Sequence, residues 1–156
     1  MSISPHERPC ALIVLAAGAG TRMNSDLPKP LHPLGGVPLM VHALTAGLAL
    51  APSRVVVVTG HGADAVEAAV AEHAPEAVCL RQEAQLGTGH AVRQAAPALD
   101  GFEGDAIVLY ADTPFVTTAT LARLRAALAR ARRPHARPSR LRRHGLTAHP
   151  LRRPPP

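Results

Sequence analysis

The sequence has 156 residues, enough for one domain with a hydrophobic core and too few for two domains of ordinary size. Hydrophobic residues make up 47% of it and aromatic residues only 2%, so we expect a core of alanine, valine and leucine. No run of 18 apolar residues occurs, and the first residues do not resemble a secretory signal. We therefore expect a cytoplasmic protein that does not span a membrane.

The net charge of +6 is unevenly distributed along the chain. Residues 1–112 hold all eleven acidic residues and six basic ones, whereas residues 113–156 hold eleven arginines and no acid. The chain is thus a mildly acidic domain followed by a basic end. Residues 130–156 contain no aromatic side chain and no amphipathic pattern, so nucleic-acid binding by this end is not expected.

Apolar patterning predicts alternating strands and helices. Short, continuous apolar runs predict buried strands at 11–15, 54–59, 77–80 and 106–110. Helical spacing of apolar residues predicts helices at 39–50, 63–73, 90–96 and 117–131, the last capped by Thr117 or Thr118. The stretch 28–38 is rich in proline and glycine, and we expect an irregular loop there. This alternation predicts an α/β fold with a Rossmann-like parallel sheet.

The end of the chain has a different composition. Residues 130–156 contain nine arginines and six prolines with almost no apolar periodicity. Such a segment has too little apolar surface to offset the entropy of ordering it, so we expect an irregular basic tail. We place the boundary after residue 129, which makes 1–129 a partial domain. The composition of the tail is also typical of a shifted reading frame in a GC-rich gene.

The turn after the first strand has features of a phosphate-binding loop. Gly18 and Gly20 allow a sharp turn whose N–H groups face outward, and Arg22 and Lys29 add positive charge. The spacing fits neither a dinucleotide fingerprint nor a Walker A loop. An ordinary strand-to-helix turn with a surface arginine remains the alternative.

Two further loops follow strands whose carboxyl ends share one edge of the predicted sheet. Asp112 ends the strand at 106–110, where a carboxylate is suited to Mg²⁺ or serves only as a cap for the next turn. Gln82 and Gln85 flank a glycine-containing loop, and their amides suit either the edge of a pyrimidine base or an exposed polar loop.

Four segments together resemble a known family. LAAGAGTRMNSDLPKPLHPLGGVPLMVHAL, VVVVTGHGADAV, QEAQLGTGHAV and VLYADTPFV occur in this order over residues 10–129. They resemble the uridyltransferase domain of bacterial bifunctional N-acetylglucosamine-1-phosphate uridyltransferase/glucosamine-1-phosphate acetyltransferases. The glycine-rich opening alone fits many sugar nucleotidyltransferases, whereas the QxxQLGTGHA segment combined with YxDTP is far more specific.

The resemblance implies transfer of a uridylyl group from UTP to N-acetylglucosamine 1-phosphate for cell-wall precursor synthesis, with Mg²⁺ as cofactor. It implies that Arg22 neutralises the departing pyrophosphate, that Lys29 holds phosphate oxygens and that Asp112 binds the metal. The other residues that it assigns to nucleotide binding are Leu15, Ala16, Ala17, Gly18, Gly20, Gln82, Gln85, Gly87, Thr88 and Tyr110.

The sequence departs from the family pattern in three places. Ala19 stands where the family usually has a lysine, and Ala111 where it often has glycine. Beyond residue 129 the resemblance ends, so the sugar-binding half, a second metal ligand and the acetyltransferase domain, through which full-length relatives oligomerise, are not expected here. We expect a truncated domain without turnover of its own.

Two alternatives stay open on the sequence. The first alternative to a uridyltransferase is a sugar-phosphate nucleotidyltransferase for another base or sugar. The second, from a different class, is a non-catalytic remnant or a basic nucleic-acid-binding protein. Competition between nucleotides separates the first from the proposed uridyltransferase.

Overall fold

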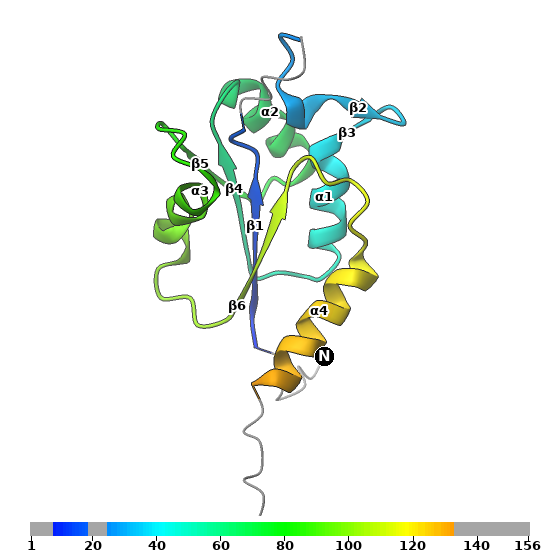
Figure 1. The fold of residues 1–156 in the computed structure, drawn as a ribbon, viewed down its shortest axis with the longest axis vertical. Coiled ribbons are helices and arrows are strands. Elements are labelled where there is room, and N and C mark those ends of the chain that lie inside the picture. Colours follow the sequence, from blue (N-terminus) through cyan, green and yellow to red (C-terminus); the bar gives the residue numbers. More distant parts are fainter. Residues whose placement is uncertain (1–7, 19–24, 133–156) are drawn as a thin grey trace, which may run out of the picture.

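The computed structural model describes residues 8–18 and 25–132, and these form a parallel sheet flanked by helices (Figure 1). The strands are β1 (Cys10–Leu15), β4 (Arg54–Thr59), β5 (Val78–Arg81) and β6 (Asp105–Tyr110), in the order β5-β4-β1-β6. All neighbouring pairs in this sheet are parallel. The α/β parallel sheet predicted from the sequence is confirmed, with strand bounds within one residue of those expected.

The chain first winds outward from β1 through β4 to β5 and then crosses back to place β6 on the other side of β1. The carboxyl ends of β1 and β6 therefore lie where the winding reverses. In open parallel sheets, ligands bind at this reversal point.

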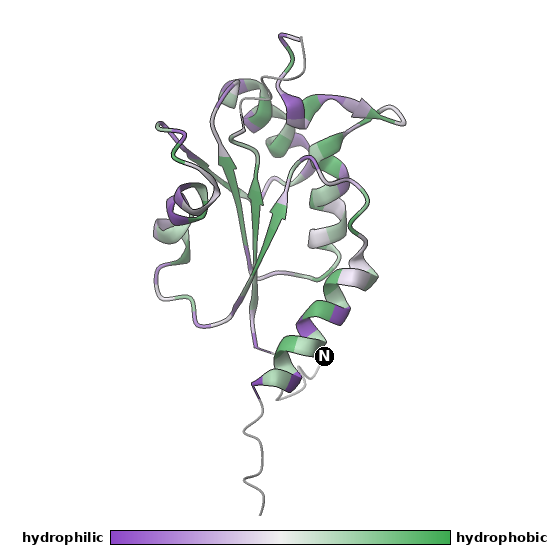
Figure 2. Cartoon of the chain, viewed as in Figure 1, coloured by the Kyte–Doolittle hydropathy of each residue, from purple (hydrophilic) through white to green (hydrophobic). Residues whose placement is uncertain are grey.

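Helices cover the two faces of the sheet unequally. Helices α1 (Leu39–Leu48), α2 (Ala63–His73) and α4 (Thr118–Ala131) pack on one face, around Leu12, Val14 and Val57. Helix α3 (Thr88–Gln94) and the short 3-10 helix η2 (Ala96–Leu99) cover part of the other face. Figure 2 shows the apolar strands between these helices. Thr117 caps α4, because its hydroxyl accepts a hydrogen bond from the Thr120 N–H, as expected.

The prediction of an irregular loop over residues 28–38 was wrong in part. The segment contains a 3-10 helix, η1 (Lys29–Leu31), and a small antiparallel hairpin of β2 (Pro33–Leu34) and β3 (Val37–Pro38). Gly35 and Gly36 form its turn with φ angles of 62° and 82°, a left-handed conformation that glycine adopts without strain. The two prolines of the hairpin face each other, so neither has to donate a hydrogen bond within a wider sheet.

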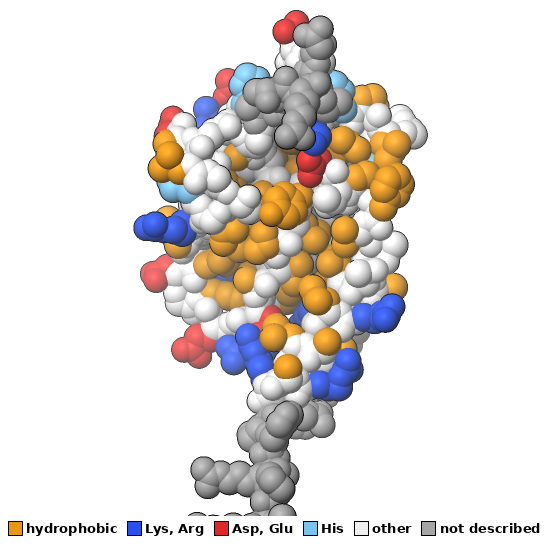
Figure 3. Space-filling model, in the orientation of Figure 1, with side chains coloured by type: hydrophobic (Ala, Val, Ile, Leu, Met, Phe, Trp, Pro, Cys, Tyr) orange, Lys and Arg blue, Asp and Glu red, His pale blue; other side chains and the backbone are white. Residues whose placement is uncertain are grey.

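Strand β6 is covered on one face only. Ile107 and Leu109 are buried, whereas Val108 and Tyr110, which point the opposite way, are 39% and 48% exposed. Among the described residues β6 pairs only with β1, so its outer edge has no partner strand there. Figure 3 shows hydrophobic side chains gathered on this side of the molecule, between α3 and α4.

The expected boundary after residue 129 falls within α4. The helix continues through Ala131, and Arg132 donates a hydrogen bond to the carboxylate of Asp105 at the start of β6. Residues 133–156, the remainder of the expected basic tail, lie outside the described residues. No helix in the described part of the chain is long and apolar enough to cross a membrane.

Candidate active site

A cavity of about 250 Å³ lies at the carboxyl ends of β1 and β6. Its walls come from the turn after β1, from η1, from the segment between β5 and α3, and from the end of β6. The residues that line it are Leu15, Ala16, Ala17, Gly18, Lys29, Pro30, Gln82, Gln85, Gly87, Thr88, Ala91, Tyr110, Ala111 and Asp112. The volume is close to the lower end of the range of roughly 300–1,000 Å³ for small-molecule sites.

Every predicted site residue that the structure describes lies on this cavity. Gly20 and Arg22, which were also predicted to bind nucleotide, lie outside the described residues, as does Ala19. Three segments far apart in the sequence are thus brought together, as expected for loops at one edge of a parallel sheet. The structure adds Pro30, Ala91 and Ala111 to the predicted set.

The turn after β1 is held in place by backbone contacts on both sides. The Ala16 N–H donates to the Val58 carbonyl at 2.8 Å, and the Ala111 N–H donates to the Leu15 carbonyl at 3.0 Å. At Gly60 a Cβ atom would lie 2.7 Å from the Ala17 carbonyl oxygen, closer than real Cβ contacts occur. The absence of a side chain at Gly60 therefore lets β4 support this turn directly.

Lys29 and Asp112 form an ion pair on one wall of the cavity. The Lys29 Nζ lies 2.6 Å from the Asp112 Oδ2, although the two residues are 83 positions apart. Their side chains are 38% and 34% exposed, so the pair is accessible from solvent. A phosphate that binds Lys29 must therefore compete with Asp112, and a metal ion that binds Asp112 must compete with Lys29.

Gln82 forms part of the opposite wall and is almost fully buried. Its backbone N–H donates to the Thr59 carbonyl at 2.7 Å, and its side-chain Nε2 donates to the Gly87 carbonyl at 3.3 Å. Gly87 has a φ angle of 92°, which favours glycine at this turn. Gln85 is exposed, and its Nε2 donates to the Ala17 carbonyl at 3.0 Å, which links this loop to the turn after β1.

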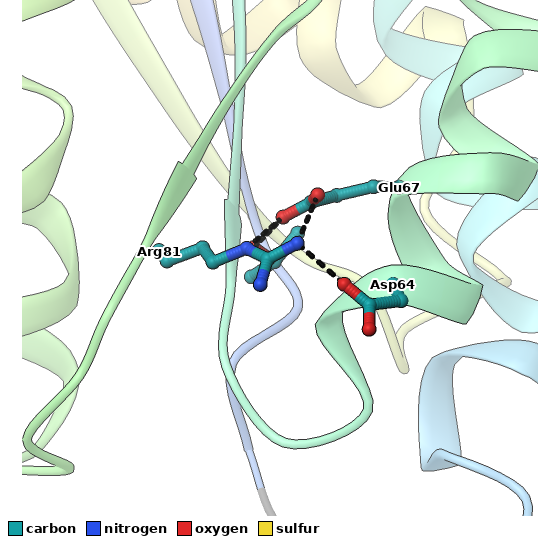
Figure 4. Close-up of polar contacts among 4 residues, drawn as sticks. Asp64, Glu67 and Arg81 are labelled. Carbon is teal, nitrogen blue, oxygen red and sulfur yellow. Dashed lines mark hydrogen bonds and ion pairs between the residues drawn. The ribbon is translucent and has the colours of Figure 1, made fainter.

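An ion-pair network is centred on Arg81, which directly precedes Gln82 in the sequence (Figure 4). Arg81 donates two hydrogen bonds to Glu67, from Nε at 2.8 Å and from Nη2 at 2.7 Å, and a third to Asp64 at 2.6 Å. Thr59, buried at the end of β4, donates to the same Glu67 carboxylate at 2.9 Å. The network thus joins α2 to the ends of β4 and β5.

These contacts shift the pKa values of both partners. The hydrogen bonds from Arg81, more than the hydrogen bond from Thr59, lower the pKa of Glu67, and the carboxylates of Glu67 and Asp64 raise the pKa of Arg81. Asp64 and Glu67 lie on α2, and nothing in the sequence indicates that Arg81 would contact them. Arg81 and Glu67 are 14 residues apart in the sequence, so no local pattern connects them. The parallel pairing of β4 and β5 brings the two side chains together.

Comparison with known proteins identifies the family of this chain. Residues 12–153 match the profile of the MobA-like NTP transferase domain family. The bifunctional protein GlmU of Jannaschia sp. (strain CCS1) is 68% identical over 122 residues, or 78% of this chain and 27% of that protein. That of Dinoroseobacter shibae is 68% identical over 119 residues, or 76% of this chain and 26% of that protein. The chain spans about a quarter of the length of these relatives.

Solved structures show the same fold. A nucleotidyl transferase from Methanothermobacter thermautotroptrophicus superposes with a TM-score of 0.59 at 27% identity, over 76% of this chain and 57% of that one. The 4-diphosphocytidyl-2C-methyl-D-erythritol synthase of Anaerococcus prevotii gives a TM-score of 0.63 at 15% identity, over 78% of this chain and 51% of that one, and is similar in fold alone. Because a family profile spans most of the sequence and the sheet is that of a nucleotidyltransferase, the chain belongs to the MobA-like NTP transferase domain family.

Proposed function

We propose that this domain belongs to an enzyme that transfers a uridylyl group from UTP to N-acetylglucosamine 1-phosphate. In this reaction a phosphate oxygen of the sugar phosphate attacks the α-phosphorus of UTP. The bond from that phosphorus to the bridging oxygen breaks, and pyrophosphate leaves with the bonding electrons. The protein has to position two anions and neutralise charge, and it needs no nucleophile of its own.

The observation that carries the proposal is the arrangement of polar groups around the cavity. Backbone groups of Leu15 to Gly18 line its floor, the segment from Gln82 to Thr88 forms one wall, and Lys29 and Asp112 stand on another. In this arrangement Gln82, Gly87 and Thr88 contact the uracil and ribose. Tyr110, at the end of β6, adds a partly exposed aromatic ring beside the sugar. The apolar floor excludes water from the base.

The charged wall suits the phosphates. Lys29 is the only lysine among the 156 residues and, within residues 8–18 and 25–132, one of two charged side chains that line the cavity. Its ammonium group would bind phosphate oxygens as their charge increases during transfer. Arg22, which lies outside the described residues, is proposed to neutralise the pyrophosphate.

The carboxylate of Asp112 fits a magnesium ion. Mg²⁺ is bound in such sites through one or two carboxylates together with substrate phosphates and water. Among residues 8–18 and 25–132 no group of three or more His, Cys, Asp or Glu side chains is placed to hold a metal. Asp112 would bind the ion weakly by itself and more tightly together with the nucleotide, where Mg²⁺ would supply electrostatic stabilisation of the phosphate charge. Lys29 must then leave Asp112 and turn to the phosphates.

Calorimetry with the full chain tests the proposal. We expect UTP with Mg²⁺ to bind more tightly than CTP or ATP, and Asp112→Asn to remove most of the metal-dependent part of the affinity. Asp100→Asn is the matched control, because it removes the same charge at an exposed position outside the cavity. Equal, metal-independent affinity for all three nucleotides would contradict the assignment.

We further propose that these 156 residues bind nucleotide without completing the transfer. Lys29 and Asp112 are the only charged side chains among the described residues of the cavity wall, and both are assigned to UTP and its metal. Within the part of the chain that the structure describes, no further charged group of that wall is left to position the phosphate of the sugar. Because positioning supplies much of the rate enhancement in such transfers, turnover by this chain alone should be very slow.

A further inference from the structure

Three side chains form a hydrogen-bonded row behind the wall of the cavity. Gln82 Nε2 lies 2.8 Å from His90 Nδ1, and Gln94 Nε2 lies 3.1 Å from His90 Nε2. His90 and Gln94 are four residues apart on α3, so they share one face of that helix. Of the three, only Gln82 lines the cavity.

The hydrogen-bonding capacity of the imidazole decides how each amide is turned. A neutral histidine has one N–H and one lone pair, so it cannot accept a hydrogen bond at both ring nitrogens. The Gly87 carbonyl, 3.3 Å from Gln82 Nε2, can only accept, and this fixes Nε2 as the atom of Gln82 on that side. His90 Nδ1 must then accept from Gln82, and His90 Nε2 must carry the hydrogen. Gln94 consequently turns its oxygen toward His90, since O and N of an amide are exchanged by rotating it.

This row determines which atom Gln82 offers to a ligand. With Nε2 engaged by both Gly87 and His90, Oε1 is the remaining group of the amide. Gln82 is 6% exposed and lines the cavity, and we infer that it meets the cavity through Oε1. Within the described part of the chain no side chain or backbone group donates to it. The cavity therefore presents a fixed acceptor at this point.

We propose that His90, supported by Gln94, positions the amide of Gln82 and thereby selects uracil over cytosine. The proposal rests on the assignment of this cavity to a pyrimidine nucleotide. Uracil presents an N–H donor at N3, which a fixed amide oxygen accepts, whereas cytosine presents a lone pair at N3, which that oxygen repels. Without His90, only the Gly87 carbonyl, at the longer distance of 3.3 Å, holds Nε2 of Gln82, so the amide rotates more readily and can offer its NH₂ group, which suits cytosine. His90 is thus a positioning residue that does not itself touch the base.

The test is the ratio of the CTP and UTP dissociation constants for the full chain, measured by calorimetry with Mg²⁺. A net hydrogen bond contributes about 1 kcal/mol, so we expect His90→Leu to lower this ratio roughly fivefold. His90→Asn should keep it, because the asparagine oxygen can accept from Gln82 near the position of Nδ1. Gln94→Met, which removes the hydrogen-bond partner of His90 Nε2 and so holds the imidazole less firmly, should lower it about two- to threefold. Arg93→Ala is the control, since Arg93 is an exposed residue of the same helix.

The possible results test the proposed function and the role of His90 separately. A wild-type chain without preference for UTP over CTP overturns the proposed function and the role of His90 with it. A wild-type preference that His90→Leu leaves unchanged overturns only the role of His90. A merely structural role predicts that both affinities fall together and the ratio stays constant. If His90→Leu does not fold, an unchanged ratio in Gln94→Met contradicts the proposal, and a lowered ratio supports it.

Discussion

Replacing Lys29 by alanine should affect metal binding and nucleotide binding in opposite directions. In the structure the Lys29 ammonium group occupies an oxygen of Asp112 at 2.6 Å, and both side chains are about one-third exposed. Ion pairs at exposed positions contribute about 0.2–1 kcal/mol, and the short distance here favours the upper end of that range. Removing Lys29 should therefore strengthen Mg²⁺ binding at Asp112 by up to about fivefold. With UTP present the lost charge-assisted hydrogen bond costs about 1.5–3 kcal/mol, or roughly ten- to a hundredfold in affinity.

Two assays measure these effects. Calorimetry with Mg²⁺ alone and then with UTP at saturating Mg²⁺ gives the two ratios between Lys29→Ala and wild type. Arg54→Ala is the control, because it removes one positive charge at the other end of the sheet, where Arg54 contacts the Ala98 carbonyl. Since Lys29 is the only lysine, amine-selective labelling followed by mass spectrometry also reports its state in the wild type. Mg²⁺ should speed its labelling and Mg²⁺ with UTP should slow it. Weaker Mg²⁺ binding in Lys29→Ala, or UTP affinity equal to wild type, would refute the exchange of partners.

Three further predictions follow from the same geometry. The pKa of Glu67 is lowered in the folded state. Its ion pair with Arg81 therefore stabilises the fold at pH values above the unfolded-state pKa of about 4.3. This stabilisation is lost as the pH falls through the lower pKa of the folded state. Thermal unfolding should therefore show a smaller loss of stability between about pH 6 and pH 3.5 in Glu67→Gln than in the wild type, and equal losses would show that the pair contributes nothing. Gly60→Ala should displace the turn at Ala17 and weaken UTP binding. Gly89→Ala should not lower stability, because a Cβ atom there meets nothing within 4 Å. Unchanged UTP affinity in Gly60→Ala would contradict the close contact. A pyrophosphate-release assay on the 156-residue chain should give no turnover above background while UTP still binds, and turnover like that of an intact uridyltransferase would disprove the proposed inactivity.

The sheet was predictable because its signals are local. The runs at 11–15 and 55–58 are continuously apolar, as strands buried on both faces require, and Thr117 stands directly before a helical pattern. The hairpin around Gly35 and Gly36 was missed, because prolines usually exclude a strand and a two-residue pair carries almost no periodicity.

The site was predictable only as a set of residues. Parallel strands that end at one edge indicate which loops meet, and this brought Lys29, Gln82 and Asp112 into one cavity. The sequence does not show that Lys29 and Asp112 are bonded to each other, since no local spacing connects positions 83 residues apart. The role of His90 was missed for a different reason. The direction of a hydrogen bond between His90 and Gln82 depends on the Gly87 carbonyl, which only the folded turn places there.

The central position of β1 has a consequence for folding during synthesis. This strand is made first, yet it pairs with β4 through Ala11 and Arg54 and with β6 through Cys10 and Asp105. At 5–20 residues per second, the ribosome needs roughly 3–10 s to add the approximately 50 residues between these two partners. During that interval a nascent chain can complete only one edge of its central strand. A translational pause between codons 54 and 105 would therefore prolong a stage in which β1 has an unpaired edge open to other chains.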